Sequence, residues 1–160
     1  MTTALRIAAL LALALAGAVL VVALRARGWS AVPELALLPV VAFGLSRGWP
    51  AGAALGLVVG LLVDLVPPGG DPLGLTPILY ALAGSLAGRA SRVGPVPVRW
   101  VAIVVLGSAA VPVVGRLLLG AWQGQQLDLA TAALTLAATV VAGVVLVPPL
   151  LRLDREEPAW

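Results

Sequence analysis

The chain carries few residues that could do chemistry, and the types it lacks exclude several classes of enzyme. Histidine, cysteine and lysine are absent, and all ten basic residues are arginine. Without those side chains there is no Ser-His-Asp or Cys-His triad, no Schiff-base lysine, no phosphate-loop lysine and no Cys/His zinc site. We therefore expect a protein that is not an enzyme and that uses no cofactor or metal.

Two charged residues remain as candidates, because both fall within apolar segments. Asp64 ends one such segment, and Arg116 lies about six residues inside another. An ionisable group at membrane depth is a functional candidate by default. We expect Asp64 and Arg116 to pair across helices; the alternatives are that Arg116 extends to the membrane surface and that Asp64 lies in the interface. A proton relay would need further acids, and Glu34, Asp71 and Asp128 occur at predicted helix starts.

Glycines recur at every fourth position of one apolar segment, as Gly52, Gly56 and Gly60, and Gly84 and Gly88 repeat the spacing later. Small residues at this interval give a smooth helix face that another helix can approach closely. Two interpretations are open: packing within this chain, or docking of a helix from another membrane protein. Gly52, Gly56 and Gly60 are therefore the candidate partner-binding residues.

The composition indicates that these residues belong to an integral membrane protein. Of 160 residues, 61% are hydrophobic and 11% are charged, and mean hydropathy is +1.10. A soluble domain is about 45–50% apolar and about 25% charged. A soluble fold of this size could not bury so much apolar surface. The net charge of +3 comes from arginines spread along the chain, which does not suggest a nucleic-acid partner.

The apolar segments predict a single membrane domain over residues 1–160, an all-α bundle of six transmembrane helices. A span needs about 20 residues, and some of these segments are shorter. Asp71, followed by Pro72, and Asp128 are predicted N-caps. A cleavable signal peptide is the competing interpretation of the first segment, although further spans follow it. The predicted helices cover residues 7–24, 32–45, 51–66, 73–88, 100–121 and 129–151.

Arginine and tryptophan positions predict the orientation. All five tryptophans fall at or just beyond predicted span ends, as expected for rings at the headgroup level. With six spans, both termini share one side with seven arginines, and only Arg25 and Arg27 lie in loops on the other side. The positive-inside rule then places both termini in the cytoplasm of a multi-pass protein of the bacterial cell membrane. The seven are Arg6, Arg47, Arg89, Arg92, Arg99, Arg152 and Arg155.

Residues from about 32 to 92 resemble the MreD family, especially its actinobacterial branch. The resemblance rests on a Pro33-Glu34 step that opens a Leu/Val-rich helix, on Arg47-Gly48, on the loop 67–74, on a final glycine motif, and on a glycine-rich helix that ends Gly60-Leu61-Leu62-Val63-Asp64-Leu65. That final motif, Gly84-Ser85-Leu86-Ala87-Gly88-Arg89, is similar to Gly-Tyr-Leu-Ala-Gly-Arg, with Ser85 in place of the usual aromatic residue.

The resemblance implies a non-enzymatic membrane scaffold of the bacterial cell-elongation (rod) complex. Such a subunit binds MreC and, through the complex, RodA, a class-B penicillin-binding protein and MreB. It supports lateral peptidoglycan synthesis and rod shape. The family is also similar in fold to the membrane S-components of energy-coupling-factor transporters. This gives the alternative function, a substrate-binding membrane subunit of a small-molecule (vitamin) importer.

The two functions differ in the surfaces that they need. An importer subunit should have a polar or aromatic pocket near the outer face and long ordered loops, whereas the predicted outer loops are short. A scaffold needs a smooth helix face, which Gly52, Gly56 and Gly60 offer, and we expect the transmembrane helix of MreC to dock there. The outer-loop motif Asp71-Pro72-Leu73-Gly74 is either a tight connector or a contact for a periplasmic partner.

Overall fold

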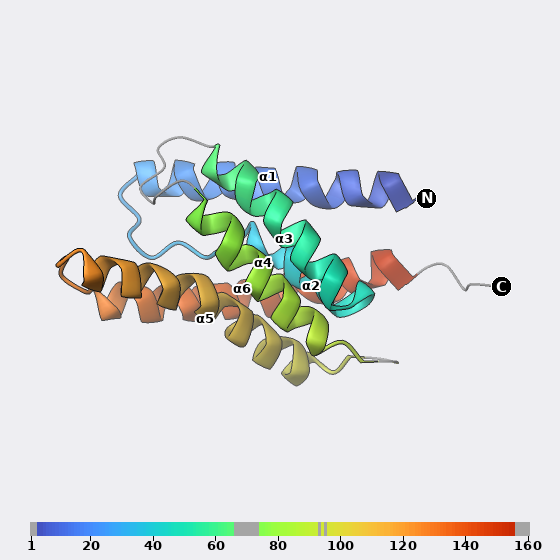
Figure 1. The fold of residues 1–160 in the computed structure, drawn as a ribbon. Helices are drawn as coiled ribbons and strands as arrows, with labels where there is room; N and C mark the ends of the chain where they lie inside the picture. The colour runs from blue at the N-terminus through green and yellow to red at the C-terminus, as the bar shows by residue number, and fades with distance from the viewer. Residues whose placement is uncertain (1–2, 66–73, 93, 95, 156–160) are drawn as a thin grey trace.

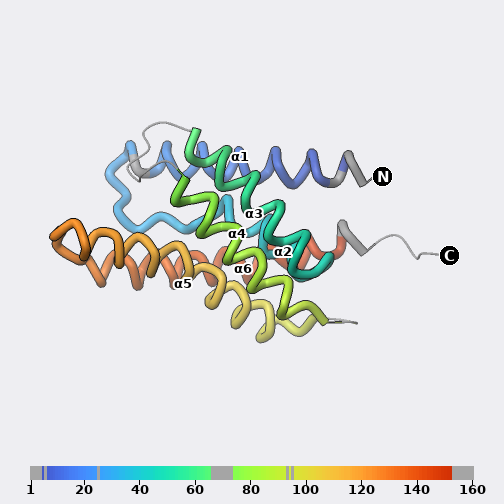
Figure 2. Tube along the Cα trace, in the orientation of Figure 1, coloured from blue at the N-terminus to red at the C-terminus, as the bar shows by residue number. Residues whose placement is uncertain are grey.

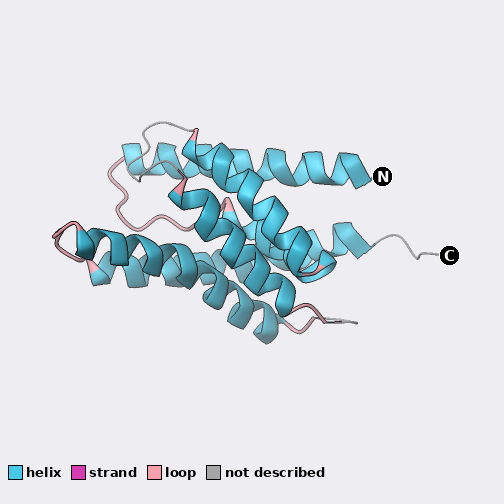
Figure 3. Cartoon of the chain, in the orientation of Figure 1, coloured by secondary structure: helices cyan, strands magenta, loops and turns pink. Residues whose placement is uncertain are grey.

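The computed structural model describes residues 3–65, 74–92, 94 and 96–155, and within these residues every regular element is an α-helix. The helices form one bundle (Figures 1 and 3), which confirms the predicted all-α class. They are α1 (Thr3–Ala26), α2 (Leu37–Arg47), α3 (Trp49–Asp64), α4 (Leu75–Arg89), α5 (Val98–Trp122) and α6 (Leu129–Arg155).

Three long helices and three short ones make up the bundle. By length and composition, α1, α5 and α6 can cross a membrane, over Ile7–Leu24, Val98–Trp122 and Leu129–Arg152. The short helices α2, α3 and α4 have 11, 16 and 15 residues. At 1.5 Å per residue they reach about 16–24 Å, less than the ~30 Å hydrocarbon core of a bilayer. The chain is a membrane protein in which short helices pack against membrane-length ones.

Helix α2 lies at the centre of the bundle and contacts all five other helices. Eight of its eleven residues are buried, among them Leu37, Leu38, Val40 and Val41. A helix that is apolar on all sides is expected where protein surrounds it. Because α2 touches every neighbour, whatever fixes its start also fixes the arrangement of the other helices.

The predicted helix over 32–45 begins too early, because α2 starts at Leu37 and residues 27–36 are not helical. Pro33 explains part of the difference, since proline disfavours the helical conformation of the residue before it. The 27–36 segment nevertheless enters the interior: Val32 is 1% exposed and Glu34 is 7% exposed. Non-helical backbone at membrane depth is tolerated where protein surrounds it and supplies its hydrogen bonds.

The other predicted boundaries agree with the structure to within a few residues. Gly48, at φ +87°, separates α2 from α3 in a conformation that glycine adopts readily. The predicted cap Asp128 is confirmed: its Oδ1 accepts the backbone N–H of Thr131 at 2.9 Å. Asp71, Pro72 and Leu73 lie outside the described residues, and α4 begins at Leu75 after Gly74.

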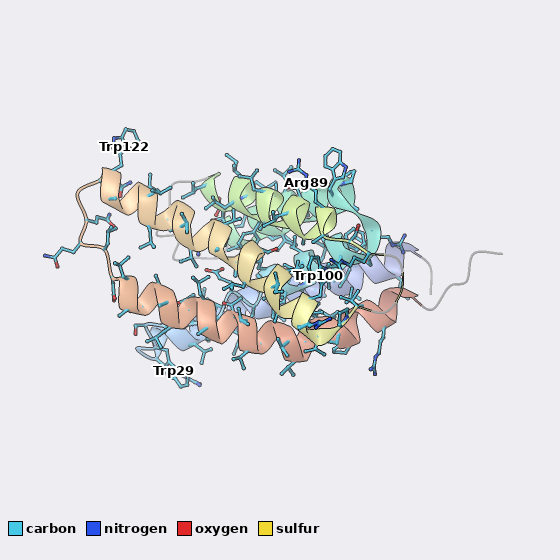
Figure 4. The ribbon with its side chains drawn as sticks, turned by 90° about the horizontal axis from the view of Figure 1, so that it is seen from below. Trp29, Arg89, Trp100 and Trp122 are labelled. Carbon is cyan, nitrogen blue, oxygen red and sulfur yellow. The ribbon has the colours of Figure 1, made fainter. Side chains whose placement is uncertain are left out.

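The two chain ends lie at the same end of the bundle (Figures 1 and 2), together with the α2–α3 turn and the α4–α5 connection. The α5–α6 loop and the 27–36 segment lie at the opposite end. Figure 4 shows Trp29 and Trp122 at that opposite end and Arg89 and Trp100 near the chain ends. Aromatic residues thus mark both ends of the bundle, as expected of a membrane protein.

Candidate functional site

Arg116 does not pair with Asp64, and this prediction is wrong. The Arg116 guanidinium forms an ion pair with Glu34, whereas Asp64 Oδ2 accepts the backbone N–H of Gly74 at 2.8 Å. The arrangement of the helices explains the difference, because α4 packs against both α3 and α5 and so lies between Asp64 and Arg116. The 27–36 segment instead brings Glu34 into the interior, next to α5.

Glu34 is the centre of a buried polar cluster, the Glu34 cluster, formed with Tyr80, Arg116 and Thr139. One carboxylate oxygen accepts from Arg116, and the other accepts the Tyr80 hydroxyl at 2.7 Å. The Glu34 backbone N–H donates to Thr139 Oγ1 at 3.0 Å, and that hydroxyl donates to the Thr135 carbonyl at 2.7 Å. The cluster therefore ties the 27–36 segment to α4, α5 and α6.

The geometry of the Glu34 cluster satisfies groups that would be costly to bury alone. Tyr80 and Thr139 are almost fully buried, and the Arg116 side chain is 25% exposed. A buried charge is tolerated when it is paired and hydrogen-bonded, and removing one partner leaves the other uncompensated. Sequence analysis assigned Glu34 to a helix start and missed Tyr80 and Thr139. The sequence signal that could have pointed to this site was Glu34 itself, an acid inside the apolar segment 32–45.

A polar pocket of about 240 Å³ adjoins the Glu34 cluster at the end of the bundle that carries the α5–α6 loop. Its lining includes Glu34 and Arg116 and the more exposed Ser30, Gln126, Asp128 and Thr131. Hydrogen bonds from the Thr131 hydroxyl and backbone lower the pKa of Asp128, so that this carboxylate is ionised at neutral pH. The pocket could admit water or a small polar molecule.

The described residues contain no group of three or more acids that could hold a metal ion. The polar side chains that line the pocket offer hydrogen bonding and charge pairing. Within the Glu34 cluster, the carboxylate and the guanidinium offset each other's charge.

The Asp64 carboxylate joins the end of α3 to the residue that precedes α4. Gly74 adopts φ +94° immediately before Leu75, and its N–H points to Asp64. Of the predicted outer-loop motif, only Gly74 lies within the described residues. The contact is that of a connector that closes the α3–α4 hairpin.

The glycine face of α3 is filled by α4 of the same chain, so the predicted docking groove for a partner helix is wrong. A Cβ atom added at Gly52, Gly56 or Gly60 would lie less than 3.0 Å from the backbone of α4. The atoms in the way belong to Gly84, Tyr80 and Pro77, respectively. The spacing correctly indicated a close helix contact, and packing within the chain is the interpretation that the structure supports.

An apolar groove of about 290 Å³ lies between α1 and α6, with the start of α2 also contributing to it. Leu13, Ala16, Leu38, Leu146 and Pro149 are among its lining residues. Helix α1 is loosely held, since only 11% of its membrane-length stretch is buried. This groove and the outer face of α1 together leave apolar surface beside a helix that the bundle covers little.

Comparison of the chain with protein-family models, with curated proteins and with solved structures finds no match.

Proposed function

We propose that the chain is a non-enzymatic membrane scaffold of the bacterial cell-elongation complex. It binds MreC and, through the complex, works with RodA, a class-B penicillin-binding protein and MreB in lateral peptidoglycan synthesis. One observation carries the proposal: the carboxylates of Glu34 and Asp64 are both used in contacts within the chain. Acids that hold the fold together suit a scaffold better than a proton relay, which needs acids that exchange partners.

The positions of the residues that carry the family resemblance support the same proposal. Glu34 contacts Tyr80, Asp64 contacts Gly74, and Gly84 packs against Gly52. These are joints between the 27–36 segment, α3 and α4. The residues that carry the resemblance are therefore residues that fix how the short helices pack. A scaffold has to keep this packing rigid.

The contact for MreC is proposed on α1 and on the groove between α1 and α6. The groove is almost wholly apolar and lies beside two membrane-length helices, so an apolar transmembrane helix suits it. Apolar burial cannot drive helix association within lipid, and the contact depends on close van der Waals fit.

We place the chain in the bacterial cytoplasmic membrane with both termini in the cytoplasm. Exposed arginines gather at the end of the bundle where the two chain ends lie, and Arg27 is an exposed arginine at the other end. This asymmetry is the one that the positive-inside rule describes. The arginines are Arg47, Arg89, Arg92, Arg99 and Arg152.

The polar pocket favours a second candidate, the substrate-binding membrane subunit of a small-molecule importer. In the proposed orientation the pocket faces the outer side, where such a subunit would take up its substrate. Its volume of about 240 Å³ suits a small polar molecule. The scaffold remains the stronger candidate because Glu34 and Arg116, two of the three charged residues that line the pocket, are already paired with each other.

Co-expression with the MreC-like protein of the same genome tests the proposal. Affinity purification in mild detergent and intact-mass analysis should give a stoichiometric complex with no bound metabolite. Ala16→Trp, which fills the α1–α6 groove, should weaken the complex, whereas Val114→Trp on the exposed face of α5 should not.

The outcomes separate the two functions. If the complex survives Ala16→Trp, the contact with MreC lies elsewhere on the chain, and the scaffold function still stands. A lone subunit that carries a vitamin-sized molecule would establish the importer. Absence of the complex both in detergent and after cross-linking in intact membranes would contradict the scaffold.

A further inference from the structure

We propose that the arginine-rich end of the bundle binds the headgroups of anionic phospholipids, at a surface formed by Arg89, Arg92 and Arg99. This surface, the arginine face, belongs to the α4–α5 connection and the helix turns on either side of it. All three side chains are exposed. The proposal is independent of MreC and of the scaffold function, because it concerns only this chain and the membrane around it.

The connection that carries these arginines is held against α5. The Trp100 indole N–H donates to the Ala90 carbonyl at 3.1 Å, and the Arg92 guanidinium lies 3.6 Å from the centre of the Trp100 ring. Arg92 therefore has a defined place against the start of α5, the helix turn that also carries Arg99. In cation–π stacking the flat face of the guanidinium lies over the aromatic ring. Its N–H groups point outward in the guanidinium plane and can still donate to an acceptor.

The end of α4 is fixed equally closely. A Cβ atom added at Gly88 would overlap the backbone of Gly48 and Trp49, so the α2–α3 turn abuts the residue before Arg89. Figure 4 shows Arg89 and Trp100 at the same end of the molecule. At this end Trp49 is exposed and Trp100 is half-buried. Tryptophan side chains favour the headgroup level of a membrane.

Charge complementarity identifies the occupant. Among the described residues, no carboxylate pairs with Arg89, Arg92 or Arg99. The acids whose side chains the structure describes, Glu34, Asp64 and Asp128, all lie toward the opposite end of the bundle, where α3 ends and α2 and α6 begin; the side chains of Asp154, Glu156 and Glu157 lie outside the described ones. Guanidinium groups at the end of α4, on the connection and at the start of α5 repel one another, and anions between them offset this repulsion. A phosphate accepts two parallel hydrogen bonds from a guanidinium, and basic clusters beside membrane helices recruit anionic lipids.

The source of the phosphate is a lipid because of where the arginine face lies. It is at the start of α5, which is long enough to cross a membrane, and Trp100 lies at the same end of the molecule (Figure 4). Headgroup phosphates lie at this depth in a bilayer, so they meet these side chains without any further binding pocket.

The test uses the purified full-length chain in detergent micelles with equal amounts of phosphatidylglycerol and phosphatidylcholine, and counts retained lipids by native mass spectrometry. Wild type should retain phosphatidylglycerol in preference to phosphatidylcholine, and added salt should reduce this preference. Arg99→Gln should weaken retention about fivefold, since each arginine near an anionic surface contributes to binding. Arg89→Gln/Arg92→Gln/Arg99→Gln should abolish the preference, and Arg27→Gln, at the other end, should not change it.

Several results would overturn the proposal. They are equal retention of the two lipids by wild type, no effect of Arg99→Gln, an equal loss with Arg27→Gln, and displacement of the lipid by millimolar inorganic phosphate. The last result would indicate a general anion site. Circular dichroism and gel filtration check that each variant is folded. If the triple variant fails to fold, the single Arg99→Gln variant and the lipid preference of wild type still test the proposal.

Discussion

Arg116 on α5 forms an ion pair with Glu34, 82 residues earlier in the chain, in the non-helical segment that precedes α2. The pair helps to hold in place the ten residues 27–36, which lie outside regular helix between α1 and the central helix α2. Side chains from α4, α5 and α6 supply the partners that lipid cannot. The start of α2, and through it the whole bundle, depends on polar contacts rather than on apolar packing alone.

Tyr80→Phe should destabilise the protein while keeping its packing. The substitution removes only the hydroxyl that donates to Glu34 Oε2 at 2.7 Å, at a residue that is 1% exposed. A hydrogen bond to a charged group contributes about 1.5–3 kcal/mol. Thermal unfolding in detergent measures the loss, and the exposed Trp49→Phe is the control that should change stability little. An unchanged unfolding temperature for Tyr80→Phe would show that the hydrogen bond to Glu34 contributes no net stability.

Gly56→Ala should destabilise the α3–α4 contact, in contrast to Gly107→Ala. A Cβ atom at position 56 would overlap the Tyr80 carbonyl, whereas at Gly107 the nearest atom, from Leu86, is 3.5 Å away. Overpacking costs about 1–3 kcal/mol, and replacing a glycine in a helix by alanine at an open site stabilises by up to about 1 kcal/mol. Opposite shifts in unfolding temperature are expected. If Gly56→Ala is as stable as wild type but no longer binds a partner helix, the glycine face would be a docking surface after all.

The first turn of α6 should become less protected at acidic pH. Hydrogen bonds from Thr131 lower the pKa of Asp128 in the folded chain. The ionised Asp128 carboxylate therefore contributes its full stabilisation above its unfolded-state pKa of about 3.9. This stabilisation is lost as the pH falls through the lower pKa of Asp128 in the folded chain. Hydrogen exchange of the first α6 amides between pH 2 and 6, corrected for intrinsic exchange, measures this.

Asp128→Asn is the matched control for the pH prediction. Asparagine also caps helix starts but does not titrate in this range, so its protection should not depend on pH beyond the intrinsic exchange rate. The same acid dependence in both proteins would assign the effect to another group.

Much of the fold followed from apolar runs interrupted by glycine and proline. Gly48 and Pro50 mark the α2–α3 turn, and Asp128 marks the start of α6. These signals are local, because they depend on the conformations that single residues permit. The start of α2 was misplaced because Pro33 and Glu34 lie inside an apolar segment whose hydropathy alone indicates a longer helix.

The candidate site could not be predicted in the same way, because its partners are set by tertiary structure. The sequence predicts similar depths for Asp64 and Arg116, yet α4 packs between α3 and α5, which carry them. Glycine spacing showed that a helix approaches α3 closely but not that the helix is α4 of the same chain. Which charges meet depends on the order of the helices around α2, and no local pattern contains that order.

The most direct test of this account is a double-mutant cycle on Glu34 and Arg116, measured as unfolding free energy in detergent. Glu34→Gln and Arg116→Gln should each cost about 3 kcal/mol, since each leaves a charge inside the protein without its partner. The double variant removes both charges and should cost clearly less than the sum of the two single losses. Additive losses would contradict the claim that this ion pair holds the 27–36 segment in the bundle.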